Sequence, residues 1–273
     1  MRQETLTTAE YAWMLEMAGA PFAFGADNAS LFPEAEASRE RQLQSGLDAL
    51  RARQLVTPDE QPDCERLDMA LARLVDVVAR PRLAIVTERR EGGARKRIVH
   101  YLTHDTLVEY ADLGEDAPDA RRHDLRALPD VPAIVLALLV LAGAPERHEI
   151  AGARIAMNEP VFAKCKQLID DGSPDKARPA LTKLGLQSDA AQSAVDAIAA
   201  PEQAGTISIV EFQGPDIVDT RVMAFFAKGG PTWLARKPAA EGNELELLAV
   251  DRPTMWTLLL ESLRSLAEPE PQA

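Results

Sequence analysis

The sequence of 273 residues has few cysteines and no long apolar run, and these shortages exclude several classes of protein. Cys64 and Cys165 are too few for a disulfide framework, and neither has a second cysteine or a histidine at metal-ligand spacing. The longest apolar run, residues 133–144, falls short of the ~20 residues that a membrane-spanning helix needs. The first residues include an acid and lead into a predicted amphipathic helix rather than a signal peptide. We therefore expect a protein of the reducing cytoplasm.

Positive charge is also in short supply. The chain has 30 Lys and Arg residues against 43 Asp and Glu residues, which makes the formal net charge −13. A negative net charge repels phosphate backbones and anionic lipids. We therefore expect neither nucleic acid nor a membrane as a partner. Hydrophobic residues make up 46% of the chain, which is enough for one large domain or two modest ones.

Motifs that mark common catalytic and nucleotide-binding sites are missing. The glycine pairs Gly92-Gly93 and Gly229-Gly230 lie in predicted turns, without the spacing or the Lys-Ser/Thr pair of a phosphate-binding loop. The Gly-x-Ser-x-Gly motif does not occur. Acidic residues are plentiful, but no pair is set apart for acid–base catalysis. The sequence thus predicts no catalytic residue, no cofactor site and no metal site, and we do not expect an enzyme.

The four histidines do not form a predicted ligand set. His100 and His104 flank a predicted hairpin turn, where no third ligand is near in the sequence, so we expect a solvated turn. His123 and His148 lie in polar, charged segments and are predicted to be surface residues.

Cys165 lies between two lysines, which is an environment that can lower the pKa of a thiol. Its helical spacing with Phe162, Leu168 and Ile169 favours a position in the core instead. We predict a buried, unreactive thiol.

Two similar successions of predicted elements follow one another along the chain. Each consists of two helices, a strand, a hairpin and a final helix. In the first succession these elements are residues 47–56, 64–79, 83–88, 97–110 and 133–142, and in the second they are residues 180–186, 188–200, 206–212, 221–235 and 254–266. Each final helix follows an Asp-x-Pro sequence, at Asp130 and Asp251, which is typical of a helix start.

This order predicts an α+β fold that is internally duplicated, with pseudo-twofold symmetry, a mainly antiparallel central sheet of six or seven strands and flanking helical bundles. Chance similarity between alanine-rich helices is the alternative to duplication. The predicted divisions are an N-terminal half at residues 1–146, a C-terminal half at 147–266 and a disordered tail at 267–273. Before the repeat, Thr7 and Glu10 form a predicted capping box that starts a helix.

One segment is positively charged, although the net charge of the chain is negative. Residues 89–97 contain five cations and one acid between two predicted strands. The basic hairpin of a DNA-binding winged helix is one interpretation. However, the helix that would enter the groove, residues 64–79, carries three acids and only two arginines. We expect a solvated loop first and a contact for an acidic protein partner second.

Several segments resemble the EspG-type chaperones of type VII secretion, and the likeness covers most of the chain. Residues 6–15 resemble the opening helix of that family, and residues 50–56 are similar to its helix that ends in a short apolar pair. In the second half, residues 157–160, residues 181–195 and the Ala200-Pro201 pair before a strand resemble the family at the same point.

The resemblance implies a non-catalytic cytosolic chaperone that binds the hydrophobic helical tip of a PE–PPE heterodimer, a secretion substrate. Partner contacts in that family would correspond here to the loop at residues 88–96 and to the helix at 254–266. The residues predicted to bind the partner are therefore Arg89, Arg90, Arg95, Lys96, Met255 and Trp256.

Two other functions remain open from the sequence. One is a small-ligand-binding protein or an enzyme that uses a cleft between the two halves, where His100 and Tyr101 stand opposite Ala224 and Phe225. The other is homodimerisation through an exposed strand edge.

Overall fold

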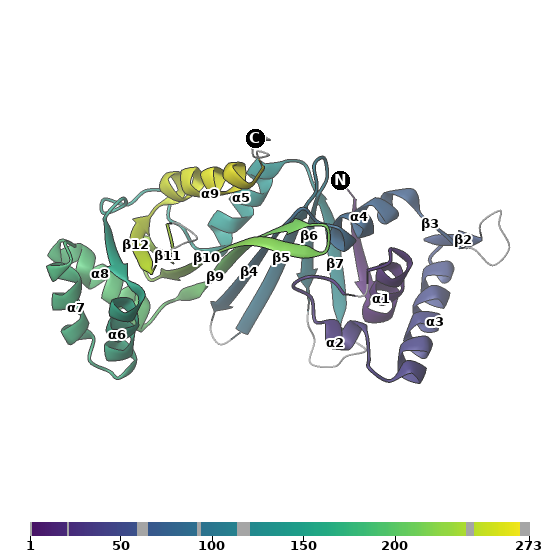
Figure 1. The fold of residues 1–273 in the computed structure, drawn as a ribbon, viewed down its shortest axis with the longest axis horizontal. Helices are drawn as coiled ribbons and strands as arrows, with labels where there is room; N and C mark the ends of the chain where they lie inside the picture. Colours follow the sequence, from purple (N-terminus) through teal and green to yellow (C-terminus); the bar gives the residue numbers. More distant parts are fainter. Residues whose placement is uncertain are drawn as a thin grey trace. The chain divides into compact units, whose positions relative to one another are not determined.

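The computed structural model describes residues 2–20, 22–58, 65–91, 94–113, 121–238 and 243–267. Cys64 and residues 268–273 of the predicted tail lie outside these ranges. The described helices are α1 (Thr8–Met17), α2 (Asn28–Leu31), α3 (Glu36–Ala52), α4 (Met69–Ala79), α5 (Val131–Leu141), α6 (Glu159–Asp170), α7 (Pro174–Lys183), α8 (Ser188–Ala199) and α9 (Arg252–Ala267) (Figure 1). The described strands are β1 (Gln3–Thr7), β2 (Val56–Pro58), β3 (Glu65–Leu67), β4 (Leu83–Glu91), β5 (Ala94–Leu102), β6 (Leu107–Asp112), β7 (Arg122–Leu128), β8 (Arg154–Asn158), β9 (Gln203–Gln213), β10 (Asp216–Ala227), β11 (Thr232–Arg236) and β12 (Glu244–Val250).

Within the described ranges, ten strands form one sheet, in the order β1-β7-β6-β5-β4-β9-β10-β11-β12-β8. The strands β2 and β3 pair separately. Every strand pair whose register is determined is antiparallel. The predicted α+β class with an antiparallel sheet is therefore confirmed, whereas the prediction of six or seven strands was too low. Four strands of this sheet were not predicted, namely β1, β7, β8 and β12. β1, β7 and β8 are short and contain polar residues that gave no clear strand signal, whereas β12 was missed although most of its residues are apolar.

The two predicted hairpins are confirmed. In the first, Leu102 of β5 pairs with Leu107 of β6, so the turn lies at residues 103–106. In the second, Ala227 of β10 pairs with Thr232 of β11, so the turn lies at residues 228–231. Local turn residues between β-rich segments determine both hairpins, which is why the sequence was sufficient to locate them.

The chain divides into two compact units that interleave along the sequence. Unit 1 comprises Met1–Val86, Arg97–Val131 and Val210–Val218, and unit 2 comprises Thr87–Lys96, Pro132–Ile209 and Asp219–Ala273. The long strands β4, β5, β9 and β10 each contribute residues to both units. The internal duplication stays a prediction.

In unit 1, helices α1, α3 and α4 share an apolar core with the inward side chains of the sheet. The predicted capping box at the start of α1 is confirmed, because Thr7 accepts from the Glu10 amide and the Glu10 carboxylate accepts from the Thr7 amide. Helix α4 begins at Met69 and not near residue 64 as predicted. Asp68 accepts from the amides of Ala70 and Leu71, which sets this start.

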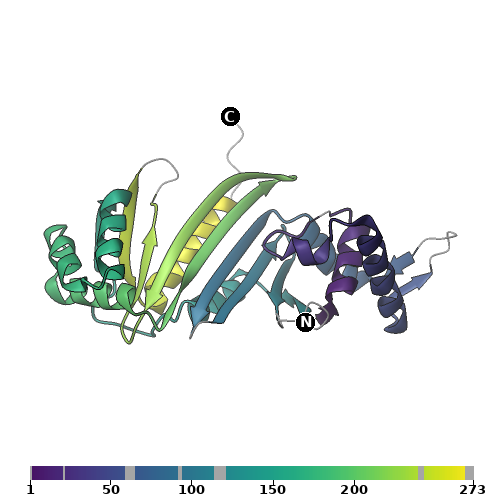
Figure 2. The ribbon, with the colours of Figure 1, turned by 90° about the horizontal axis from the view of Figure 1, so that it is seen from below.

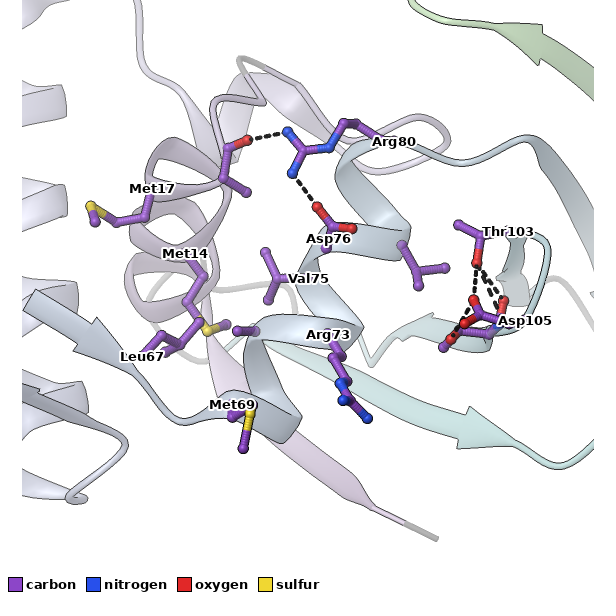
Figure 3. A pocket seen from close by; sticks show the side chains of 14 residues that line it. Met14, Met17, Leu67, Met69, Arg73, Val75, Asp76, Arg80, Thr103 and Asp105 are labelled. Atoms are coloured by element: carbon purple, nitrogen blue, oxygen red, sulfur yellow. Dashed lines mark hydrogen bonds and ion pairs between the residues drawn. The ribbon is translucent and has the colours of Figure 1, made fainter.

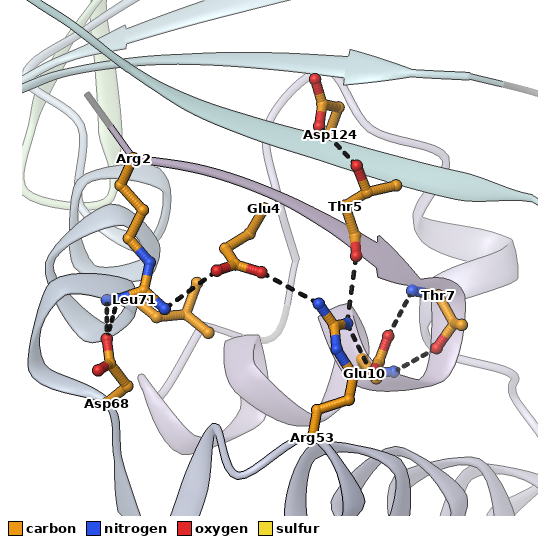
Figure 4. Close-up of polar contacts among 9 residues, drawn as sticks. All are labelled: Arg2, Glu4, Thr5, Thr7, Glu10, Arg53, Asp68, Leu71 and Asp124. Atoms are coloured by element: carbon orange, nitrogen blue, oxygen red, sulfur yellow. Dashed lines mark hydrogen bonds and ion pairs between the residues drawn. The ribbon is translucent and has the colours of Figure 1, made fainter.

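Strand β1 lies at one edge of the sheet, and polar side chains form a network of hydrogen bonds and ion pairs that includes one of its backbone carbonyls (Figure 4). Arg53, just after α3, donates to the Thr5 carbonyl at 3.2 Å, to Glu10 at 2.9 Å and to Glu4 at 3.0 Å. Glu10 is buried, so this pair supplies its countercharge. Because Arg53 takes the Thr5 carbonyl, this edge is less open to pairing with another strand.

In unit 2, helices α6, α7 and α8 cluster together and share a core with the strands β8, β11 and β12 (Figures 1 and 2). Trp233 of β11 is fully buried at the centre of this core, and its indole nitrogen donates to the Ser193 hydroxyl at 3.2 Å. The small alanines on the inner face of α8 allow the helix to lie close to the sheet. The predicted helix start at Asp251 is also confirmed, because its carboxylate accepts from the Thr254 amide in the first turn of α9.

Candidate functional site

The basic segment that the sequence singled out is an extended hairpin rather than the predicted solvated loop. Residues 89–91 belong to β4 and residues 94–97 to β5, and the two glycines between them lie outside the described residues. The prediction failed because the charged side chains obscured the strand pattern. Strands β4 and β5 extend into this segment in spite of its charged side chains.

The cations of this hairpin differ in their contacts. Arg95 donates to the Glu88 carboxylate at 2.5 Å, and Arg97 donates to the Gly25 carbonyl at 3.1 Å. Arg90 and Lys96 are exposed, and neither has an ion pair with any residue that the structure describes. Arg89 is half-buried. Arg90 and Lys96 are therefore the predicted partner-binding cations whose charges are available to a partner.

The two apolar residues of α9 that were predicted to contact a partner also differ in their exposure. Met255 is fully buried and contributes to the interior of unit 2. Trp256 is half-buried, so part of its ring reaches the surface. Of the two side chains, only Trp256 is placed to touch a partner without a rearrangement of α9.

Unit 2 also contains a groove that the sequence did not predict. Its volume is about 650 Å³, and residues of β10, β11, β12, α6 and α9 line it. Val222 of β10 is 49% exposed, and Phe162 of α6 and Ala224 of β10 line the same groove half-buried. The sequence gave no signal for this groove, because an exposed valine on a strand cannot be distinguished from a buried one by its spacing.

The walls of this groove are ionic and neutral overall. Arg236 donates to Glu246 through two nitrogens, at 2.9 Å and 2.8 Å. Lys237 pairs with Glu159 at 2.9 Å. Because each of these cations already has an acidic partner, the groove offers an apolar floor to a ligand rather than a net charge.

Two histidines lie in the core of the sheet, contrary to expectation. His100 and His123 are both fully buried, whereas His104 lies in the exposed hairpin turn as predicted and His148 is half-buried. His123 occupies an inward position of β7, where outward charged residues hid the alternation from the sequence. The expectation that His100 and His123 are solvated was therefore wrong.

His100 belongs to a row of polar side chains across three neighbouring strands. Its Nε2 lies 3.1 Å from Glu109 of β6, and Arg126 of β7 donates to the other Glu109 oxygen at 2.6 Å. Burial acts to raise the pKa of Glu109, but hydrogen bonds from His100 and Arg126 outweigh it and lower the pKa. The row holds the Glu109 carboxylate between His100 and Arg126 and so links the side chains of β5, β6 and β7.

His123 lies in a second buried cluster, with two tyrosines. Tyr110 contacts His123 Nδ1 at 3.0 Å, and His123 Nε2 lies 3.2 Å from the Thr8 hydroxyl. The rings of Tyr11 and Tyr110 stack with centroids 5.5 Å apart. Burial lowers the pKa of His123 to about 4 and raises the pKa of Tyr110. The imidazole is therefore neutral at pH 7 and cannot act as a base with a solvent-exposed substrate.

Cys165 occupies the predicted core position, with Ile169 on the same inner face of α6. Burial raises the pKa of its thiol, against a smaller effect of Lys164. The prediction of an unreactive thiol can be tested in the Cys64→Ser variant, which leaves Cys165 as the single cysteine. We expect Ellman's reagent to label little of this thiol in the folded protein and all of it in denaturant. Rapid stoichiometric labelling of the folded protein would contradict a core position.

No helix within the described ranges is long and apolar enough to cross a bilayer. In the same residues, no three His, Cys, Asp or Glu side chains lie close enough together to hold a metal ion.

Comparison with known proteins identifies the fold but no sequence relative. No protein-family model matches the chain, and none of the curated proteins is similar to it in sequence. Among solved structures, the chain is similar to the Mycobacterium tuberculosis type VII secretion system chaperone EspG5, solved in complex with a PE25–PPE41 dimer. The TM-score is 0.71 at 11% sequence identity, and the alignment covers 100% of this chain and 99% of that chain. The resemblance to EspG-type chaperones is thus confirmed at the level of the fold.

Proposed function

We propose that this protein is a non-enzymatic, cytosolic, chaperone-like protein that binds a helical protein partner through unit 2. The observation that carries the proposal is the full-length likeness to EspG5, a chaperone solved with a bound protein dimer. A fold alone does not determine function, so the surface of this chain must supply the rest of the argument.

The groove of unit 2 supplies an apolar docking site. Val222 and Phe162 present apolar surface in a depression of about 650 Å³, within the range that ligand sites use. The paired walls at Arg236 and Lys237 leave no unbalanced charge to repel an apolar side chain. An apolar helix tip, which would aggregate if left exposed, fits this combination.

The basic hairpin supplies an electrostatic contribution. Arg90 and Lys96 carry exposed charges without ion pairs among the described residues, in a protein whose net charge is −13. Such isolated cations attract acidic side chains of a partner and increase the rate of association. The hairpin therefore favours a partner with acidic residues beside its apolar tip.

The proposal predicts that the purified chain recovers a stoichiometric helical protein from a lysate of its source organism. With that partner in hand, Val222→Asp is expected to weaken binding about tenfold or more, because a charge enters the apolar floor of the groove. The double variant Arg90→Glu, Lys96→Glu should slow association and lower its salt dependence. Binding is measured by surface plasmon resonance at several salt concentrations.

A matched control is Lys176→Glu, Lys183→Glu, which makes the same change of charge on exposed positions of α7. This control should bind as the wild type does. The proposal fails if no stoichiometric protein is recovered, or if the groove variant and the α7 control bind equally well. A metabolite that raises the melting temperature in the absence of any protein partner would instead support a small-ligand receptor.

A further inference from the structure

Unit 1 has a groove of its own on the surface of α4 (Figure 3). Its volume is about 680 Å³, and its apolar lining includes Met14, Leu67 and Met69. The charged side chains that line it are Arg73, Arg80, Asp76 and Asp105. Because these charges balance, the groove does not specify one kind of ligand. The strand β8 is more specific, because the unpaired backbone of an edge strand binds another extended strand.

Part of the backbone of β8, at the edge of the sheet, has no partner among the residues that the structure describes. The amide of Ala249 in β12 donates to the Ala153 carbonyl at 2.9 Å, which fixes the alternation of the ladder between β8 and β12. The odd-numbered residues of β8 therefore bond with β12. The residues that direct backbone groups away from β12 are Arg154, Ala156 and Asn158, and their side chains are all exposed.

The two edges of the sheet differ in their protection. At the β1 edge, Arg53 donates to the Thr5 carbonyl (Figure 4). Strand β8 contains no proline, and its single charged residue, Arg154, lies 4.0 Å from Glu246 of the neighbouring β12. Natural proteins block exposed edges with prolines and charged side chains, and β8 has little of either. Its backbone is therefore available to a further strand.

The residues of β8 fit antiparallel pairing of this strand with its own copy. When a two-fold axis passes between the two Ala156 residues, Arg154 lies opposite Asn158 of the second copy. The single charge of the strand thus meets a neutral side chain. Ile155 lies opposite Met157, and both belong to the apolar core of unit 2. Parallel pairing would instead place the two Arg154 side chains beside each other, and like charges in that position are destabilising.

We propose that two copies of this chain pair through β8, antiparallel and centred on Ala156, and so form one continuous sheet. The Ala156 amide of each copy donates to the Ala156 carbonyl of the other, and the Asn158 amide donates to the Arg154 carbonyl. This pairing goes beyond the proposed function, because residues 154–158 do not line the groove of unit 2. Either proposal can therefore fail while the other holds.

The dimer is expected to be weak. A single pair of short strands gives a small interface, and each copy has a formal net charge of −13, so the two copies repel each other. Added salt screens this repulsion, and backbone hydrogen bonds do not depend on it. The dimer should therefore dissociate on dilution and should become more stable as the salt concentration rises.

Analytical ultracentrifugation of the full chain between about 1 and 500 µM tests the dimer, with Ala156→Pro as the first variant. Proline removes the outward amide at the two-fold axis but no bond with β12, so the variant should fold. We expect its dimer dissociation constant to rise about tenfold or more. A wild type that stays monomeric over the whole range would overturn the proposal.

Opposite charges at the axis test the register. The variants Ala156→Glu and Ala156→Lys each place like charges opposite each other and should be monomeric, whereas an equimolar mixture of the two should form a heterodimer. Glu246 lies opposite Ala156 within the chain, so the glutamate variant can lose stability, and the lysine variant avoids this effect. Ala37→Glu and Ala37→Lys, on exposed α3, are the matched controls and should dimerise as the wild type does. A mixture that stays monomeric contradicts pairing at Ala156.

The competing interface is the exposed apolar face of α5, where Leu136 is 55% and Val140 is 62% exposed. If Val140→Glu abolishes the dimer and Ala156→Pro does not, the proposal is wrong. Amide exchange measured by NMR separates the remaining cases, because the Ala156 and Asn158 amides should exchange more slowly as the protein concentration rises. If the chain stays monomeric and these amides are protected only in the presence of another protein, that protein supplies the strand, and the homodimer is ruled out.

Discussion

Replacing Gly46 with alanine is expected to lower the free energy of unfolding by about 3 kcal/mol. Gly46 lies on the inner face of α3, where that helix crosses α1. A Cβ atom at this position would lie 2.1 Å from the carbonyl oxygen of Ala9. Backbone atoms cannot avoid this clash by a change of rotamer, so α3 must move away from α1 and expose part of the core of unit 1.

Urea denaturation measures the effect, with Ser45→Ala as the matched control. Ser45 is the preceding residue, and its side chain is exposed on the outer face of α3. Alanine there should leave the stability unchanged or raise it slightly, because alanine has the higher helix propensity. If Gly46→Ala unfolds at the same urea concentration as Ser45→Ala, the close approach of α3 to α1 is wrong.

Lowering the pH from 7 to 4 is expected to cost the protein about 3 kcal/mol of stability through His123 alone. Burial lowers the pKa of this histidine to about 4 in the folded state, whereas the unfolded chain keeps a value near 6.5. Between these two values the unfolded state binds more protons than the folded state. The contribution is therefore fully present above pH 6.5 and declines as the pH falls through this window.

The measurement is the pH dependence of the unfolding free energy for the wild type and for His123→Gln. Carboxylates also titrate as the pH falls, so the difference between the two curves isolates the histidine. The slope between pH 6.5 and about 4 should be smaller in the variant by about the amount that one proton contributes. Parallel curves for the wild type and His123→Gln would show that His123 is solvated or already charged.

Local sequence signals were sufficient for the elements that local interactions determine. Both hairpins lie where the turn residues placed them, and Thr7, Glu10 and Asp251 cap the helices that they were predicted to start. Cys165 was also correctly predicted, because helical periodicity alone identifies the inner face of α6. In each case the deciding atoms lie within a few residues of one another.

Strand pairing between distant segments was not available from the sequence. β7 contains charged residues on its outer face and a histidine on its inner face, so its sequence resembles a polar loop. Only the structure shows that it pairs with β1 and β6. The basic segment at residues 89–97 was mistaken for a loop for a related reason. Its cations lie on β4 and β5, which are neighbours in the sheet, and only β9, the other neighbour of β4, comes from a distant part of the chain.

The two grooves are the clearest example of what the sequence withheld. Met14, Leu67 and Met69 are spread over more than 50 residues of sequence, and Val222 and Phe162 over 60, so only folding brings each set together.

By itself, the sequence determined the α+β class, the caps, the hairpin turns and the excess of negative charge, because these depend on composition and on neighbours along the chain. Only the tertiary structure decided which cations stay unpaired, which histidines lose contact with water and where apolar side chains remain exposed. Those properties depend on which distant atoms surround a group, and long-range packing alone sets that.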